Sequence, residues 1–142
     1  HEIDGVSFKE VLEGKNVNVR DVVYSEFGHS RAIKSKNWKY IAVRYPDKIQ
    51  NKIDKGGKFR PFKKGEPLLD LPYISRNGHL GHYASVKNPH YFEANQLYNL
   101  KLDPEENNNI YASTPEIAKP LQVKLSKWLK KFADRPFGEF TH

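Results

Sequence analysis

The sequence predicts an α+β fold, in which a small antiparallel β-sheet of about four strands packs against one long C-terminal α-helix, with a long irregular loop insertion. Two observations lead to this fold. Short runs rich in β-branched and aromatic residues recur between turn signals, which is typical of strands, and residues 113–132 carry a helical period. The 142 residues suit one ordinary domain. We therefore expect a single domain over 1–142 with an irregular region at 45–92 inside it.

The N-terminal part is expected to form a helical turn and then a strand. Four spaced apolar residues indicate the turn: Val6, Phe8, Val11 and Leu12. The turn should end at Gly14, because glycine readily adopts the positive φ that terminates a helix. Residues 20–26 follow, with Val22, Val23 and Tyr24 at their centre, and this composition predicts a strand.

The next two strands form a predicted hairpin. Residues 31–34 and 38–44 are separated by Ser35-Lys36-Asn37, which has the length of a hairpin turn. Side chains alternate between the two faces of a strand, so Trp38, Tyr40 and Ala42 should share one face. The apolar character of this face indicates that it is buried.

Residues 45–92 show no regular spacing of apolar residues, because five prolines and several glycines interrupt the segment. The segment from Arg44 to Glu66 has eight basic residues against three acidic ones, a net charge of +5 in a chain whose total is +7. Such a segment favours an anionic partner or is a solvated loop. Regular structure returns at 95–100, a predicted fourth strand. A polar turn follows at 103–109, where Glu105 and Glu106 should face water.

The C-terminal helix is the clearest element. Ser113-Thr114-Pro115-Glu116 resembles a capping box, with proline in the first turn. Apolar residues then recur at helical spacing: Ile117, Leu121, Leu125, Trp128, Leu129 and Phe132. Pro120 lacks one backbone N–H, so we expect a kink there or a regular start farther downstream.

The composition excludes several functional classes. The chain has no Cys, which excludes a disulfide framework, a thiolate nucleophile and a Cys-ligated zinc site. It also has no Met and begins at His1, so we expect a processed product or a piece of a longer protein. No apolar run is long enough to cross a bilayer, and we expect no membrane partner. We do not expect nucleic acid as a partner, because no recognition helix stands out.

Gly78-His79-Leu80-Gly81-His82 is the one local arrangement that resembles a ligand site. The glycines indicate a loop, where sequence spacing fixes no geometry. A zinc site would need a third ligand that is not evident nearby. Contact with an anion or a sugar, metal binding, and loop histidines bonded to the backbone all remain open. No nucleophile elbow, phosphate-binding loop or His-Glu-x-x-His motif occurs.

The order of the motifs resembles the carboxy-terminal subdomain of formylglycine-dependent sulfatases, in the alkaline-phosphatase-like superfamily. The matching segments are Asp4-Gly5-Val6-Ser7-Phe8 with Leu12-Glu13-Gly14, Tyr24-Ser25-Glu26-Phe27-Gly28, Arg31-Ala32-Ile33-Lys34 with Trp38-Lys39-Tyr40-Ile41, Gln96-Leu97-Tyr98-Asn99-Leu100, and Asp103-Pro104-Glu105-Glu106-Asn107-Asn108. The terminal helix follows in its usual place. The resemblance covers essentially the whole chain.

The resemblance implies no catalytic residue and no metal ligand in this chain. Sulfatases make formylglycine from Cys or Ser in a C/S-x-P/A-x-R motif and hold calcium on a large amino-terminal domain. The sequence contains no such motif. Formylglycine and calcium are therefore expected in an absent N-terminal domain, no cofactor is expected in this chain, and whether the chain can be called an enzyme is left open.

The resemblance implies a subdomain that helps to wall the substrate pocket of an enzyme hydrolysing sulfate esters, on a sulfated carbohydrate, and that is inactive alone. Its expected partners are the N-terminal catalytic domain and the substrate. The expected substrate contacts are Arg76, His79 and His82, together with His29 and Arg31. The expected compartment is periplasmic or secreted, or lysosomal in a higher cell. The alternatives are a free-standing binding module for acidic glycan or nucleic acid and a subdomain of a related phosphatase or phosphodiesterase.

Overall fold

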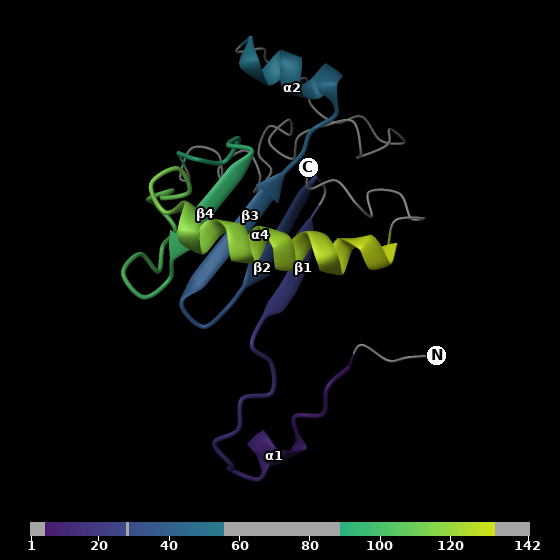
Figure 1. Cartoon of the computed structure of the whole chain (residues 1–142), viewed down its shortest axis with the longest axis vertical. Coiled ribbons are helices and arrows are strands. Elements are labelled where there is room, and N and C mark those ends of the chain that lie inside the picture. The colour runs from purple at the N-terminus through teal and green to yellow at the C-terminus, as the bar shows by residue number, and fades with distance from the viewer. Residues whose placement is uncertain (1–4, 28, 56–88, 133–142) are drawn as a thin grey trace, which may run out of the picture.

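The computed structural model describes residues 5–27, 29–55 and 89–132. Four strands form one antiparallel sheet in the order β1-β2-β3-β4: β1 (Val23–Phe27), β2 (Ser30–Lys34), β3 (Trp38–Val43) and β4 (Asn95–Asn99). Helix α4 (Pro115–Leu129) continues into the 3-10 turn η3 (Lys130–Phe132) and crosses one face of the sheet (Figure 1). The predicted α+β fold is confirmed.

The strand register explains which side chains reach the helix. Ile33 lies opposite Tyr40, and Tyr40 lies opposite Leu97. These three side chains form a row on the face toward α4, and each is fully buried. Trp38 and Ala42 pack on the same face as Tyr40, as the alternation along this strand predicted.

Helix α4 closes the core with a stripe of buried side chains at helical spacing: Ala118, Leu121, Leu125 and Leu129. Farther along the helix, the Trp128 ring stacks on Tyr24 of β1, with ring centroids 4.6 Å apart and planes 1° from parallel. The helix is therefore held over both a central strand and an edge strand.

The start of α4 differs from the predicted capping box. The N-cap is Thr114, with Pro115 as the first helical residue, and no side chain caps the free amides. The hydroxyls of Ser113 and Thr114 instead donate to the carbonyl oxygen of Ile110. Pro120 lies inside the helix without moving its start downstream. The capping box failed because a nearby carbonyl competes for the same hydroxyls.

Two further helices flank the sheet. The predicted N-terminal turn is α1 (Lys9–Leu12), followed by Gly14 at φ +79°. Helix α2 (Asp47–Asp54) forms within the region where no regular element was predicted. Asp47 lies in its first turn, where a carboxylate suits the helix dipole, and Gln50 donates to Asp54 one turn later, at 2.8 Å. Six of the eight residues of α2 are polar, and its two isoleucines, Ile49 and Ile53, are too few to stand out in the sequence as a helical period.

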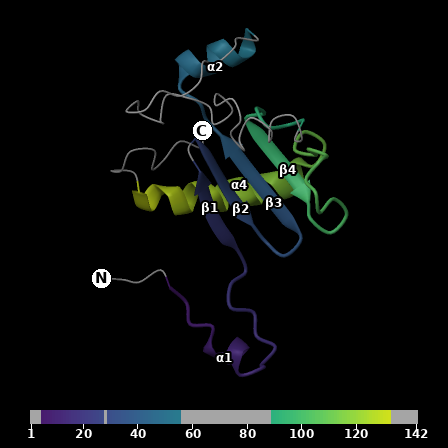
Figure 2. The same cartoon turned by 180° about the vertical axis from the view of Figure 1, so that it is seen from behind.

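Both views place α1 beyond one end of the sheet and α2 beyond the other (Figures 1 and 2). Figure 2 shows the second face of the sheet, which no described helix covers. Within the described residues, no helix is long and apolar enough to span a bilayer.

Candidate functional site

The turn after β4 is fixed by hydrogen bonds and by an ion pair to the sheet. The Asp103 carboxylate accepts hydrogen bonds from the backbone amides of Asn107 and Asn108, at 3.0 and 2.9 Å. Glu106 has a φ of +58°, and its two carboxylate oxygens accept hydrogen bonds from the Lys39 ammonium at 2.9 and 2.7 Å. Glu105 is exposed, as predicted, but Glu106 is partly buried in an ion pair. The pair could not be read from the sequence because Lys39 is distant in the chain.

Asn109 ties this turn to the outer edge of β4. Its side-chain oxygen accepts hydrogen bonds from the amides of Leu97 and Tyr111, at 2.8 and 3.0 Å. Its side-chain nitrogen donates to the carbonyl of Asn95 at 2.9 Å and to the carboxylate of Glu93 at 2.5 Å. One amide therefore fixes the edge strand and holds a carboxylate in place.

The Glu93 carboxylate also interacts with a histidine side chain. The Glu93 carboxylate lies 2.6 Å from Nδ1 of His90. Burial raises the pKa of Glu93, but the hydrogen bonds from His90 and Asn109, with the charge of His90, outweigh it and leave the pKa below its ordinary value. Bonding at Nδ1 fixes the orientation of the imidazole and leaves Nε2 available for another group. The sequence analysis did not identify this His-Glu-Asn chain; the His-x-x-Glu spacing was its only local signal.

Arg44 forms hydrogen bonds at the end of the sheet where β3 ends and β4 begins. Its guanidinium donates to the carbonyls of Val43 and Ala94 and, at 2.9 Å, to the side-chain oxygen of Asn95. The Tyr40 hydroxyl donates to that same oxygen at 2.8 Å. Burial raises the pKa of Tyr40 against the opposing effect of Arg44. The guanidinium therefore joins the end of β3 to the start of β4.

Aromatic rings gather beside these polar groups. The rings of His29 and Tyr45 meet edge to face at 5.4 Å, Tyr45 and Phe92 lie 6.3 Å apart, and Tyr91 meets Phe92 at 5.3 Å. Burial, and then the neighbouring Tyr91, raise the pKa of Tyr45. The cluster therefore places apolar ring faces beside the imidazole of His29, and Tyr45 directly follows Arg44 in the chain.

The structure places two of the five predicted site residues. His29 is 6% exposed and lies in the ring cluster. Arg31 is 4% exposed, on the face of β2 toward α4, and its Nε lies 3.2 Å from the Glu26 carboxylate. Burial lowers the pKa of Arg31, and Glu26 opposes this shift. The structure does not bring His29 and Arg31 into one exposed site, and their role as substrate contacts stays a prediction.

The other three predicted site residues, Arg76, His79 and His82, lie outside the described residues. Within the described ranges, no group of three or more His, Asp or Glu side chains is arranged to hold a metal ion.

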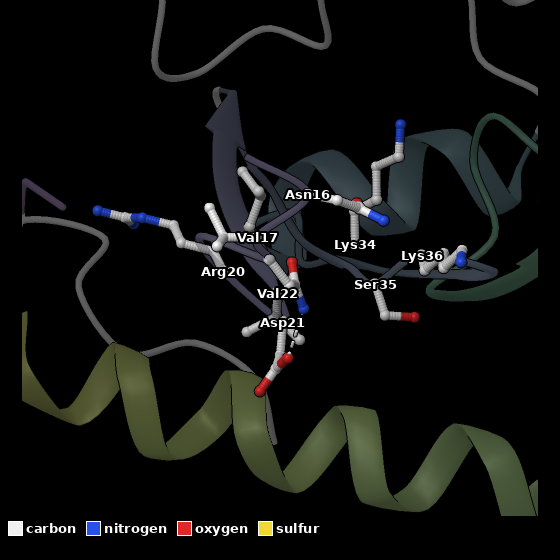
Figure 3. A pocket seen from close by; sticks show the side chains of 10 residues that line it. Asn16, Val17, Arg20, Asp21, Val22, Lys34, Ser35 and Lys36 are labelled. Atoms are coloured by element: carbon white, nitrogen blue, oxygen red, sulfur yellow. Dashed lines mark hydrogen bonds between the residues drawn. The ribbon is translucent and has the colours of Figure 1, made fainter. Parts of the chain in front are cut away.

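A cavity of about 650 Å³ lies at the opposite end of the sheet, between residues 16–23 and the β2–β3 turn. Three cationic residues line it, Arg20, Lys34 and Lys36. Figure 3 shows their side chains pointing in three different directions, so they do not converge on one anion. Asp21 is also at its wall, and its carboxylate accepts a hydrogen bond from Asn18 at 2.8 Å.

Among known proteins, similarity to this chain is found in solved structures. No protein-family model matches the chain, and no curated protein matches it. Among solved structures, the chain is similar to part of a sulfatase of Bacteroides thetaiotaomicron, described in connection with the metabolism of multiple glycosaminoglycans by a versatile core genetic locus. The identity is 21%, the TM-score is 0.45, and the match covers 93% of this chain. It spans 20% of that solved chain.

Proposed function

We propose that this chain is the C-terminal subdomain of a sulfatase that hydrolyses sulfate esters on a carbohydrate. It contributes structure and part of the substrate pocket wall and is inactive alone. Formylglycine and calcium belong to an N-terminal catalytic domain, which is its partner, and the compartment is periplasmic, secreted or lysosomal. The observation that carries the proposal is the order of the sequence motifs along the chain.

The places of these motifs in the fold support the proposal. The motif beginning at Arg31 forms β2, the motif beginning at Trp38 forms β3, and the motif beginning at Gln96 lies in β4. The Asp103 motif forms the turn that pairs with Lys39. These four motifs therefore supply strand pairing, core packing or turn closure, which is the role of a supporting subdomain.

The end of the sheet near His90 is the described part best suited to wall a sugar pocket. His90 is oriented by Glu93, and aromatic rings and Arg44 lie close in the fold. In the proposed enzyme, imidazole and guanidinium donors would bind hydroxyl or sulfate oxygens, and charge-assisted hydrogen bonds of this kind are strong and directional. Arg76, His79 and His82 are proposed to contribute similar contacts.

The first test concerns the reaction. An aryl sulfate and a sulfated disaccharide are incubated with the 142-residue chain and with the complete polypeptide that the proposal implies. Turnover is expected only for the complete polypeptide. Turnover by the chain alone, or a preceding sequence without a C/S-x-P/A-x-R motif, would overturn the proposal.

The second test concerns the pocket wall. In the complete polypeptide, His79→Ala with His82→Ala should lower kcat/KM for the sulfated sugar more than for a small aryl sulfate, because the lost contacts are to the sugar. Lys124→Ala, on an exposed position of α4, is the matched control and should change neither. Equal kcat/KM for the variant and the parent enzyme on the true substrate would remove these residues from the site.

The cationic segment from Arg44 to Glu66 favours a second candidate function, binding of an acidic glycan or nucleic acid by the chain itself. This function predicts retention on a heparin column with affinity that falls steeply as salt rises. The subdomain function predicts weak retention. A third candidate, a phosphatase or phosphodiesterase subdomain, predicts hydrolysis of an aryl phosphate in place of the sulfate.

A further inference from the structure

We infer that the N-terminal arm, defined as residues 5–22, is a docking element that packs against an apolar, electrically neutral protein surface. This inference rests on the proposed function, in which that surface belongs to the catalytic domain.

The arm exposes an unusual share of apolar side chains. Nine large hydrophobic side chains are exposed among the described residues, and seven of them lie between residues 6 and 27. They are Val6, Phe8, Val11, Leu12 and Val17 in the arm and Val23 and Phe27 in β1. Scattered exposed hydrophobics are ordinary, but their concentration in one segment indicates an interaction surface.

The arm has a defined conformation without a core of its own. Helix α1 has four residues and none of them is buried. Backbone hydrogen bonds join residues of the arm to one another, as from Leu12 to Phe8 and from Lys15 to Glu10, at 3.2 and 2.9 Å. A helix this short is unstable by itself in water. It needs a surface on which to pack, and both views show α1 apart from the sheet (Figures 1 and 2).

The charges of the arm indicate the chemistry of its partner. It carries three basic and three acidic residues, Lys9, Lys15, Arg20, Glu10, Glu13 and Asp21. Lys9 pairs with Glu13 at 3.6 Å, and Lys15 pairs with Glu10 and Glu13 at 3.2 and 3.4 Å. Since these charges are neutralised within the arm, it gives an anionic or cationic partner no net attraction. The exposed apolar side chains instead favour an apolar surface.

Strand β1 continues this surface into the sheet. It is an edge strand, and four of its five residues are exposed. Tyr24 faces α4, so alternation puts Val23 and Phe27 on the face that no described helix covers. An exposed apolar edge is a ready site for association. A partner that covers the arm and this face would bury both parts.

Limited trypsin digestion tests the inference on the chain alone and on the complete polypeptide. Cleavage after Lys9 and Lys15 should be at least about tenfold slower in the complete polypeptide, because docking protects the arm against the local opening that cleavage requires. Cleavage after Lys101, in the exposed turn after β4, is the internal control and should be unchanged. Equal cleavage rates at Lys9 and Lys15 in both proteins would overturn the inference.

Paired substitutions give a second readout. Phe8→Ser and Leu12→Ser should leave the Tm of the isolated chain unchanged and lower the Tm of the complete polypeptide. Leu102→Ser and Val123→Ser, also at exposed sites, 80% and 66% exposed, should lower neither. Sedimentation of the chain should show a monomer; a dimer that Phe8→Ser dissociates would make a second copy the occupant and overturn the inference.

These readouts do not depend on turnover, so the two proposals fail separately. A protected arm in a protein without sulfatase activity would retain the docking inference and reject the proposed function. An active sulfatase whose arm is cleaved at the rate of the isolated chain would do the reverse.

Discussion

Lys39 and Glu106 are joined by an ion pair with Nζ 2.7 Å from Oε2, although 67 positions separate them in the chain. Lys39 is on β3. Among the residues that the structure describes, Glu106 is the non-glycine residue with a positive φ, +58°. The pair holds the turn after β4 against the sheet and supports a backbone conformation that a non-glycine residue adopts at a cost of about 1–2 kcal/mol.

Substitutions at Glu106 should separate the ion pair from the backbone. Glu106→Ala loses the pair and keeps the unfavourable φ, whereas Glu106→Gly loses the pair and relaxes the backbone. We expect the glycine variant to be more stable than the alanine variant by about 1 kcal/mol in urea unfolding. Lys39→Met should cost about 0.5–1 kcal/mol. An alanine variant as stable as the glycine variant would contradict the left-handed conformation.

Leu125 should be the most informative core position on α4. Its side chain is fully buried, and truncation of such a leucine leaves a cavity. Leu125→Ala is expected to lower the free energy of unfolding by about 2–5 kcal/mol. Val123→Ala on the same helix is the matched control, since Val123 is 66% exposed, and it should change stability by less than about 0.5 kcal/mol. Similar losses for both variants would place the helix in another orientation.

Acid should weaken the fold through Glu93. The folded pKa of Glu93 lies below its ordinary value of 4.5, so between these two values the unfolded chain binds more protons. The contribution of Glu93 is therefore complete above about pH 4.5 and is lost as the pH falls through the folded value. The stability difference between the parent chain and Glu93→Gln should shrink from pH 6.5 to pH 3.5 in urea titrations. A constant difference would show that the carboxylate charge does not stabilise the native state.

Alkali should weaken the fold through Tyr98. Burial, followed by the charges of Glu106, Glu93 and Asp103, raises the pKa of its hydroxyl above the ordinary value of 10.0. Between the two pKa values the unfolded chain has lost a proton that the native chain keeps, so stability falls as pH rises. One proton corresponds to about 1.4 kcal/mol per pH unit.

Tyr98→Phe should reduce this alkaline slope. The variant loses the hydrogen bond from the hydroxyl to the Gln96 side chain, 2.8 Å long, at a cost of about 1 kcal/mol at pH 8. Urea unfolding between pH 9 and 11.5 should then show a shallower decline than the parent chain, while the slopes agree near pH 8. Identical slopes above pH 10 would exclude Tyr98 as the titrating group.

Several elements could be predicted from local pattern alone. Alternation along residues 38–43 assigned Trp38, Tyr40 and Ala42 to the buried face, and the helical period assigned Leu121 and Leu125 to the core. Both signals follow from backbone geometry, because a strand repeats every two residues and a helix every 3.6. Helix α2 was not predicted, and the hydroxyls at the start of α4 bond to the Ile110 carbonyl in place of the predicted capping amides.

Local sequence pattern is enough to predict the fold class, the buried faces of β3 and α4, and the order of the motifs. The contact of Lys39 with Glu106, the hydrogen bonds of Asn109 to both β4 and Glu93, and the exposure of β1 at the sheet edge follow from the packed arrangement of the chain. Periodicity reports the local conformation of the chain. Which distant polar groups become partners depends on strand order and loop closure, which bring residues together only after the sheet and helix have packed.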